Sequence, residues 1–234
     1  MAAQAVLERS LVPTRHGPAR LLRSPAERAW TTLVLGHGAG GGAQARDLGW
    51  LAHDLPAAGI QVIRVEQPWR VAGRKVAARA AVLDEGWFDV LAQLELATPL
   101  VVGGRSAGAR VACRTAVSAG ALGCLALAFP LHPPWRPEQS RLPELQASGV
   151  PTLVVQGERD PFGVAADFTE LPDNCRVAAV IDADHEFAVR RGSPRTSALT
   201  RADLISCVLG WLREIIPAAT TPANAPAPSP GRMA

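Results

Sequence analysis

Short apolar runs alternate with amphipathic stretches along most of the chain. The runs are rich in Val, Leu and Ile, which predicts strands buried on both faces, whereas the stretches between them favour helices. The predicted strands are 19–23, 31–36, 60–66, 99–104, 122–129, 151–156 and 176–181. The predicted helices are 44–58, 74–95, 106–119, 138–147, 163–170 and 200–216.

This alternation predicts an α/β fold with a mostly parallel, twisted sheet covered by helices on both faces. Residues 1–216 are expected to form a single domain. The segment 217–234 is rich in Pro and Ala with almost no large apolar residues, so we expect a disordered tail. The short, proline-rich segment 130–149 is the candidate lid, and we therefore expect a minimal lid and an open site.

A serine lies where one predicted strand turns into a helix, in Gly104-Arg105-Ser106-Ala107-Gly108. A G-x-S-x-G segment in this context is typical of a nucleophile elbow, a sharp turn that holds the serine hydroxyl above the sheet edge. The glycines are needed because a side chain at either position would collide with a neighbouring strand or helix. The alternative is that Ser106 only caps the helix.

Two later strands are followed by loops that carry the other residues a serine nucleophile needs. Asp160 follows the first of these strands and His185 follows the second. A histidine can take the serine proton near neutral pH, and a carboxylate fixes the histidine tautomer. The order Ser, Asp, His is one of the known chain orders of such a triad. Asp182 and Asp184 are too close to His185 in the chain to be its usual partner.

Each of these two residues has an alternative interpretation. Asp160 could cap a helix that begins at Pro161. His185 could be a surface loop residue. Both candidates nevertheless fall at the carboxyl ends of predicted parallel strands, where ligands bind in such sheets.

A glycine-rich loop, 36–42, follows an earlier predicted strand. Glycines let backbone N–H groups turn toward a ligand oxygen. We expect the N–H groups of Ala39 and Ala107 to form an oxyanion hole, with Gly40 as the near alternative to Ala39. A phosphate-binding loop is excluded by spacing, because no G-x-x-x-x-G-K-[ST] segment is present. His37 is predicted to have a structural role, with hydrogen bonds to this loop.

Five blocks of the chain together point to a known family: 36–40, 103–110, 129–134, 156–163 and 182–187. They resemble α/β-hydrolases related to dienelactone hydrolase, and the bacterial KAN/Tex-type hydrolase-like branch in particular. The resemblance extends over about 21–216 and implies an α/β-hydrolase fold with Ser106, Asp160 and His185 as the triad. Dienelactone hydrolases typically have a cysteine nucleophile, whereas this chain has a serine. The difference argues against dienelactone as the substrate.

Several residues near the predicted site are candidates for substrate binding. Arg105 adjoins the nucleophile, so its guanidinium could bind an anionic group or, alternatively, form a salt bridge to a neighbouring helix. His132 and Trp135 lie on the candidate lid. A second predicted mouth loop carries charges that either contact substrate or form a solvated rim: Arg70, Arg74 and Lys75. A substrate role for Arg105 would favour esters with a nearby negative group.

Composition narrows the classes of function. The net charge is only +3, and no helix has a basic stripe with aromatics, so nucleic-acid binding is not expected. No apolar run approaches the ~20 residues that span a bilayer, and the first residues do not resemble a signal peptide, so we expect a cytoplasmic protein without membrane contact. The cysteines and histidines lack metal-ligand spacing, so neither a metal nor a cofactor is expected.

Two function hypotheses follow from the sequence. The first is a serine hydrolase that cleaves a small carboxylic ester or thioester through an acyl-enzyme on Ser106. The second is a non-catalytic interaction domain that keeps the hydrolase fold, because fold alone does not imply function. In either case we expect a monomer or a small homo-oligomer.

Overall fold

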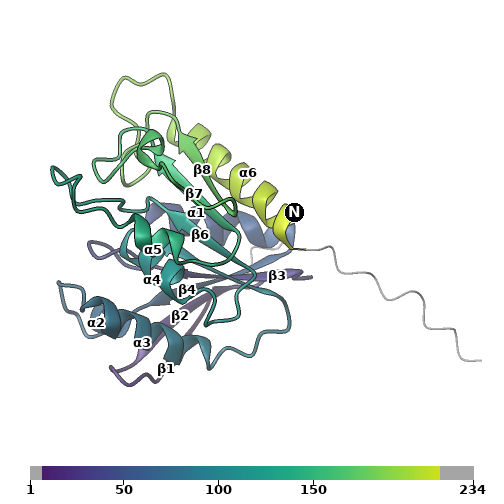
Figure 1. The fold of residues 1–234 in the computed structure, drawn as a ribbon. Helices are drawn as coiled ribbons and strands as arrows, with labels where there is room; N and C mark the ends of the chain where they lie inside the picture. Colours follow the sequence, from purple (N-terminus) through teal and green to yellow (C-terminus); the bar gives the residue numbers. More distant parts are fainter. Residues whose placement is uncertain (1–6, 217–234) are drawn as a thin grey trace, which may run out of the picture.

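The computed structural model describes residues 7–216, and a single eight-stranded sheet forms its centre (Figure 1). The strands are β1 (Glu8–Val12), β2 (Ala19–Ser24), β3 (Thr31–Gly36), β4 (Ile60–Glu66), β5 (Leu100–Arg105), β6 (Gly123–Leu127), β7 (Thr152–Gly157) and β8 (Cys175–Val180). Their order in the sheet is β1-β2-β4-β3-β5-β6-β7-β8. Strands β3 to β8 are parallel, and the antiparallel β1–β2 hairpin extends the sheet beyond β4. The predicted mostly parallel sheet is thereby confirmed.

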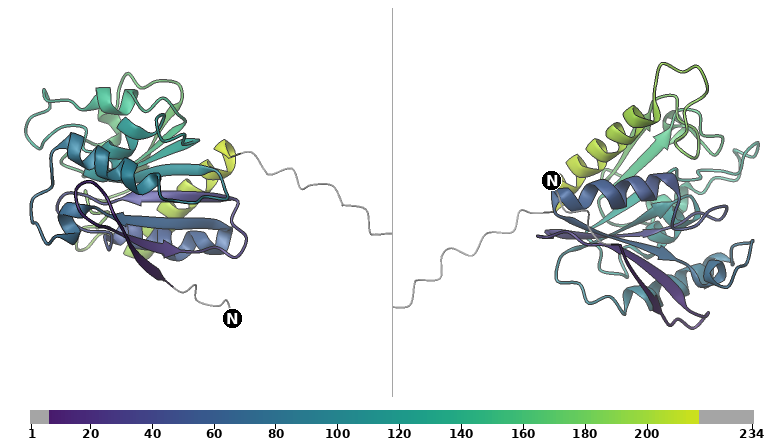
Figure 2. Two further views of the ribbon diagram at one scale, coloured as in Figure 1. Left: turned by 90° about the horizontal axis from the view of Figure 1, so that it is seen from below. Right: turned by 180° about the vertical axis from the view of Figure 1, so that it is seen from behind.

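Helices cover both faces of this sheet, as predicted (Figure 2). One face is covered by α1 (Arg46–Asp54) and α6 (Ser197–Ile215). The opposite face is covered by α3 (Ala80–Leu91), α4 (Ala107–Thr115) and α5 (Leu142–Gln146). Each face therefore has its own hydrophobic core.

Strand β3 shows how the two cores share the sheet. Leu33 and Leu35 pack into the core beneath α1 and α6, whereas Val34 packs into the core beneath α3 and α4. Successive strand side chains point to opposite faces, so all three are fully buried. This explains why the strands have continuous apolar runs instead of alternating apolar and polar positions.

Some predicted helices are shorter or divided in the structure. The predicted helix 44–58 is α1 followed by the 3-10 turn Leu55–Ala58, where Pro56 cannot donate an N–H to a continuing α-helix. The predicted helix 163–170 contains only a 3-10 turn, Ala165–Asp167.

The predicted helix 74–95 is also wrong in its first part, because α3 begins only at Ala80. No side chain caps that helix start, so the sequence offered no signal for its position. The preceding short helix α2 (Pro68–Val71) was not predicted. Strand β1 was not predicted either, because it is an exposed edge strand without an apolar pattern.

The candidate lid, 130–149, ends in α5, which packs against α4. Glu144 of α5 accepts hydrogen bonds from Arg110 Nε at 2.9 Å and from Arg114 Nη1 at 2.5 Å. This part of the segment is therefore fastened to the body of the protein, in keeping with a minimal lid.

The predicted tail, 217–234, lies outside the described residues. Within residues 7–216, no helix combines the length and the apolar character needed to cross a bilayer.

Candidate active site

Ser106 occupies a strained turn between β5 and α4. Its backbone has φ 51° and ψ −114°, a conformation that non-glycine residues rarely adopt. A Cβ at Gly104 would lie 2.6 Å from the carbonyl oxygen of Gly36, and one at Gly108 would lie 2.4 Å from the same atom. The elbow thus packs directly against the end of β3, and this close approach explains both glycines.

The structure brings Ser106, His185 and Asp160 into one hydrogen-bonded series. The Nδ1 of His185 donates to Asp160 Oδ2 at 2.7 Å, since a carboxylate can only accept. The other ring nitrogen, Nε2, lies 3.1 Å from Ser106 Oγ, so it can accept the hydroxyl proton. Ser106 and His185 are 79 positions apart in the chain and meet at the carboxyl edge of the sheet.

Buried donors hold the Asp160 carboxylate in place. Asp160 is only 3% exposed. Its Oδ2 also accepts from Gln156 Nε2 at 2.9 Å, and its Oδ1 accepts from the Phe162 N–H at 2.9 Å. The ring of Phe162 lies 4.4 Å from that of His185, centroid to centroid. The carboxylate therefore has fixed partners on both oxygens.

The two rival aspartates have other partners. The Asp182 carboxylate lies 3.0 Å from the guanidinium nitrogens of Arg159 and Arg190. Asp184 Oδ1 accepts hydrogen bonds from the backbone N–H groups of Glu186 and Ala188 in the same loop. Of the three, Asp160 is therefore the carboxylate that contacts His185.

His37 is a structural residue of the glycine-rich loop, as expected. Its Nδ1 donates to the Gly38 carbonyl oxygen at 2.8 Å, and its Nε2 accepts from the Gln67 backbone N–H at 3.1 Å. Burial lowers the pKa of His37, which favours the neutral ring that this pair of contacts requires. Both ring nitrogens are occupied, so His37 is not a second base.

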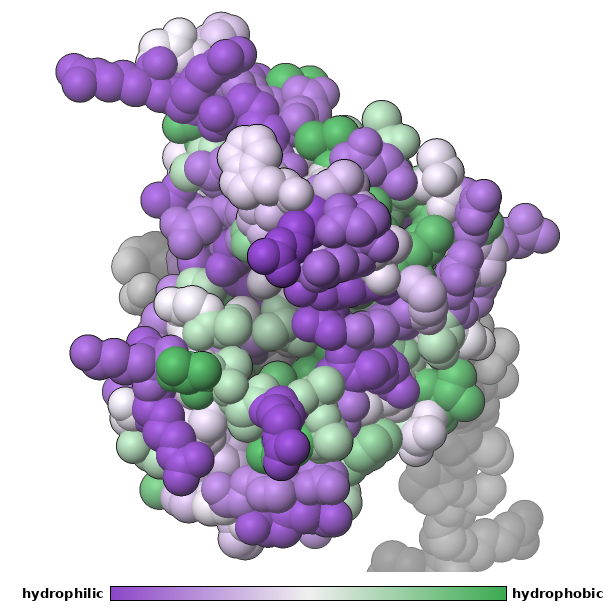
Figure 3. Space-filling view, turned by 60° about the vertical axis from the view of Figure 1, so that its left-hand side comes forward, coloured by the Kyte–Doolittle hydropathy of each residue, from purple (hydrophilic) through white to green (hydrophobic). Residues whose placement is uncertain are grey.

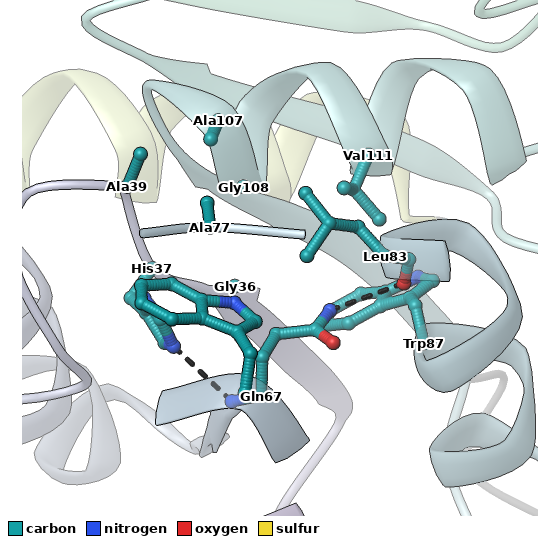
Figure 4. A pocket seen from close by; sticks show the side chains of 11 residues that line it. Gly36, His37, Ala39, Gln67, Ala77, Leu83, Trp87, Ala107, Gly108 and Val111 are labelled. Atoms are coloured by element: carbon teal, nitrogen blue, oxygen red, sulfur yellow. Dashed lines mark hydrogen bonds between the residues drawn. The ribbon is translucent and has the colours of Figure 1, made fainter. Parts of the chain in front are cut away.

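A small pocket lies between the glycine-rich loop and the first turn of α4 (Figure 4). Ala39 and Ala107 line one side of it, and the apolar side chains of Leu83, Trp87 and Val111 line the other. Its volume is about 10 Å³, which is room for about one water molecule. Within residues 7–216, neither the Ala39 nor the Ala107 N–H donates to another backbone group. The predicted pair of N–H donors thus borders a single pocket.

A larger cavity of about 340 Å³ lies beyond this pocket. Gln67, Trp69 and Leu83 line both spaces and so form the wall between them. Arg74, one of the predicted rim charges, lines the larger cavity and not the small pocket.

Arg105 is buried, which argues against the substrate contact considered from the sequence. Its side chain is 8% exposed and pairs with Asp47, Nε to Oδ2 at 3.2 Å. A second guanidinium nitrogen, Nη2, donates to the backbone carbonyl of His185 at 2.5 Å. The geometry favours the alternative, an ion pair to a neighbouring helix, because Asp47 belongs to α1.

The other two substrate-binding candidates differ in position. The His132 N–H donates to the Phe162 carbonyl at 3.1 Å, so His132 lies against the loop that carries Asp160. Trp135 is 93% exposed. Figure 3 shows apolar side chains gathered around a hollow on one face of the molecule, with hydrophilic groups around them. His132 remains a candidate substrate contact, whereas the Trp135 side chain extends into solvent.

Within 7–216, no group of three or more His, Cys, Asp or Glu side chains is placed to hold a metal ion. The sulfurs of Cys113 and Cys124 lie 3.7 Å apart in the core, and both cysteines are fully buried free thiols.

The strand order and the strained serine turn define an α/β-hydrolase. A family model described as an alpha/beta hydrolase domain matches residues 29–212, and the chain belongs to this family. This assignment supports hydrolase activity in general terms. The comparison with curated proteins gave no match.

Several solved structures have the same fold. XC6422 from Xanthomonas campestris, described as an α/β serine hydrolase without a lid, is 18% identical with a TM-score of 0.71 over 91% of this chain and 96% of its own. A dienelactone hydrolase from Anabaena variabilis is 16% identical with a TM-score of 0.71, over 92% and 100%. Est1E from Butyrivibrio proteoclasticus, solved with ferulic acid, is 13% identical with a TM-score of 0.67, over 87% and 99%. These likenesses confirm the predicted fold.

Sequence reasoning missed two buried polar residues of the site. Gln156 supports Asp160, and Asp47 pairs with Arg105. A polar residue within the apolar run of β7 was a visible signal for Gln156. Asp47 gave no comparable signal, because an acidic residue in the first helical turn is common on surfaces.

Proposed function

We propose that the protein is a serine hydrolase that cleaves a small carboxylic ester or thioester. The observation that supports this most is the 3.1 Å contact between Ser106 Oγ and His185 Nε2, with Asp160 behind the imidazole at 2.7 Å. A nucleophile, a base and an orienting carboxylate in this order are what acyl transfer to serine requires.

The reaction proceeds in two halves. His185 Nε2 takes the proton of Ser106 as Oγ attacks the carbonyl carbon, and then gives that proton to the departing alcohol or thiol. Water, deprotonated by the same nitrogen, attacks the acyl-serine and releases the acid. The N–H groups of Ala39 and Ala107 stabilise the negative oxygen that forms in both halves.

The size and lining of the small pocket favour a substrate with a short acyl group. It borders Ala39 and Ala107, is lined mainly by apolar groups and has a volume of about 10 Å³. A carbonyl oxygen held by the two N–H groups would direct its substituent toward this wall. Acetyl and other short esters are therefore the proposed substrates, and thioesters with the same acyl groups are equally compatible.

Substitution of the nucleophile tests this function. Ser106→Ala should abolish hydrolysis of p-nitrophenyl acetate while the fold persists, since removing a triad serine costs ~10⁶ in kcat in a well-studied case. A fluorophosphonate probe should label the wild type and the exposed-serine variant Ser10→Ala, but not Ser106→Ala. A folded Ser106→Ala protein with wild-type turnover would contradict the serine mechanism.

A further inference from the structure

A buried ion pair joins Arg105, the residue next to the nucleophile in the chain, to Asp47. Arg105 is the last residue of β5 and immediately precedes Ser106. Its side chain is 8% exposed, and that of its partner Asp47 is 2% exposed. Charges this deeply buried are retained only where geometry and partners compensate for lost hydration.

The guanidinium group joins three separate segments of the chain. Arg105 Nε donates to Asp47 in the first turn of α1, and Nη2 donates to the His185 carbonyl oxygen at 2.5 Å. The same residue is covalently bonded to Ser106. A single rigid group thus links the segment that carries the nucleophile to the backbone that carries the base.

Asp47 is well placed as an anchor for this group. It lies in the first turn of α1, where the helix dipole favours a negative charge. Burial raises the pKa of the Asp47 carboxyl, and Arg105 opposes that rise by favouring the charged form. Arg105 therefore favours the ionised form of the carboxyl group with which it pairs.

We propose that Arg105 is a positioning residue for His185, held in place by Asp47. It sets the separation between His185 Nε2 and Ser106 Oγ by fixing the His185 backbone to the nucleophile turn. This inference rests on the proposed hydrolase function. The planar fork of arginine suits the task because it can direct two donors at once, which a lysine ammonium cannot do with the same geometry.

Two substitutions separate positioning from simple stabilisation. Arg105→Lys keeps a positive charge near Asp47 but loses the fork. The double variant Arg105→Met/Asp47→Leu removes both charges and leaves no buried charge unpaired. For a neutral acetate ester, both should lower kcat by at least ~10-fold with KM within about twofold, because small misplacements of reacting groups can cost ~10² in rate.

Arg114→Lys is the matched control. Arg114 of α4 forms ion pairs with Asp84 of α3 and with Glu144 of α5, on the face of the sheet opposite α1. This variant should retain the wild-type kcat even where its thermal stability falls. An equal loss of kcat in this control would contradict the assignment of positioning to Arg105.

A spectroscopic measurement makes the test independent of turnover. In protein with ¹⁵N-labelled histidine, the low-field Nδ1 proton of His185, bonded to Asp160, should be present in the wild type and Arg114→Lys. It should weaken or disappear in the Arg105 variants, because their imidazole is no longer held. The resonance is assigned by its loss in His185→Gln.

Three outcomes would overturn the proposal. One is a folded Arg105→Met/Asp47→Leu protein with wild-type kcat, and another is an unchanged Nδ1 resonance in that protein. The third is an increase in KM confined to esters that carry a carboxylate, which would make Arg105 a substrate-binding residue. If the wild type shows no Ser106-dependent hydrolysis, the proposed function fails, and the resonance alone still decides whether Arg105 positions His185.

Discussion

At the scale of single residues, hydrogen-bond and ion-pair partners distinguish groups that look equivalent in the sequence. Asp160, Asp182 and Asp184 all lie near strand ends, but only Asp160 contacts the His185 ring. Gln156 and the Phe162 N–H occupy its remaining acceptor positions. This arrangement keeps the carboxylate fixed and directed at Nδ1, so its removal should affect the imidazole more than the fold.

Asp160→Asn tests this role. An amide in place of the carboxylate can favour the wrong imidazole tautomer, and the same change costs about 10⁴ in kcat in a well-studied triad. We expect a loss of similar order, measured with a short p-nitrophenyl ester.

Asp182→Asn is the corresponding control. Asp182 belongs to the same loop as His185 but pairs with Arg159 and Arg190. Its kcat should stay close to that of the wild type. If Asp182→Asn were as inactive as Asp160→Asn, the loop as a whole and not one carboxylate would determine the activity.

At the scale of elements, the site depends on how the ends of neighbouring strands and helices meet. The end of β3 is separated from the serine turn only by hydrogen atoms at Gly104 and Gly108. Helix α3 contributes Leu83 and Trp87 to the small pocket, although neither lies close to Ser106 in the chain. Substrate size is therefore expected to depend on α3 as much as on the catalytic loops.

Leu83→Ala should change the preferred acyl length. Leu83 forms part of the wall between the small pocket and the 340 Å³ cavity, so its truncation should join the two spaces. The ratio of kcat/KM for hexanoate to that for acetate esters should rise by about 10-fold or more, since each methylene in an apolar pocket is worth 10- to 200-fold.

A second truncation controls for lost stability. Leu83→Ala should cost about 2–5 kcal/mol, as buried leucine truncations do. Leu145→Ala removes an equally apolar, fully buried side chain of the same core without lining the pocket. The same shift in acyl preference in Leu145→Ala would show that general loosening, and not the pocket wall, sets chain length.

At the scale of the whole molecule, ion pairs connect the helices that cover one face of the sheet. Glu144 of α5 pairs with Arg110 and Arg114 of α4, and Arg114 also pairs with Asp84 of α3. Burial alone would raise the pKa of Glu144, but the two arginines outweigh it and lower the pKa. A carboxyl group with a lowered folded-state pKa stabilises the protein above its unfolded-state pKa, and this contribution is lost as pH falls through the folded-state pKa.

Glu144→Gln should therefore reduce the free energy of unfolding near neutral pH. Its difference from the wild type should shrink as pH falls below the unfolded pKa of about 4.3. Urea unfolding of the variant and the wild type, at neutral and at acidic pH, measures this difference in the free energy of unfolding.

Glu214→Gln offers a contrast, because Glu214 pairs with Arg176 on the open surface. Exposed pairs contribute little to stability, so this variant should unfold almost like the wild type. A pH-independent effect of Glu144→Gln, or an equal effect of Glu214→Gln, would show that the half-buried ion pairs of Glu144 are not the source of the lost stability.

Most of the strands, and the reactive residues at their ends, could be predicted from the sequence alone. The bounds of β3 and β4 were predicted correctly, because strands buried on both faces are continuous apolar runs with sharp ends. The glycines around Ser106 also pointed to the elbow, since the turn requires them wherever it occurs. Both the apolar runs and the glycines act over a few neighbouring residues, so they can be interpreted without knowledge of the folded structure.

The contacts between residues far apart in the chain arise only in the folded protein. Nothing in the sequence paired Arg105 with Asp47, 58 positions away, or hid its guanidinium from substrate. Strand β1 exists because β2 offers it an edge, not because of an apolar pattern of its own. Burial and partner choice arise when the sheet and its helices pack, so they belong to the fold as a whole.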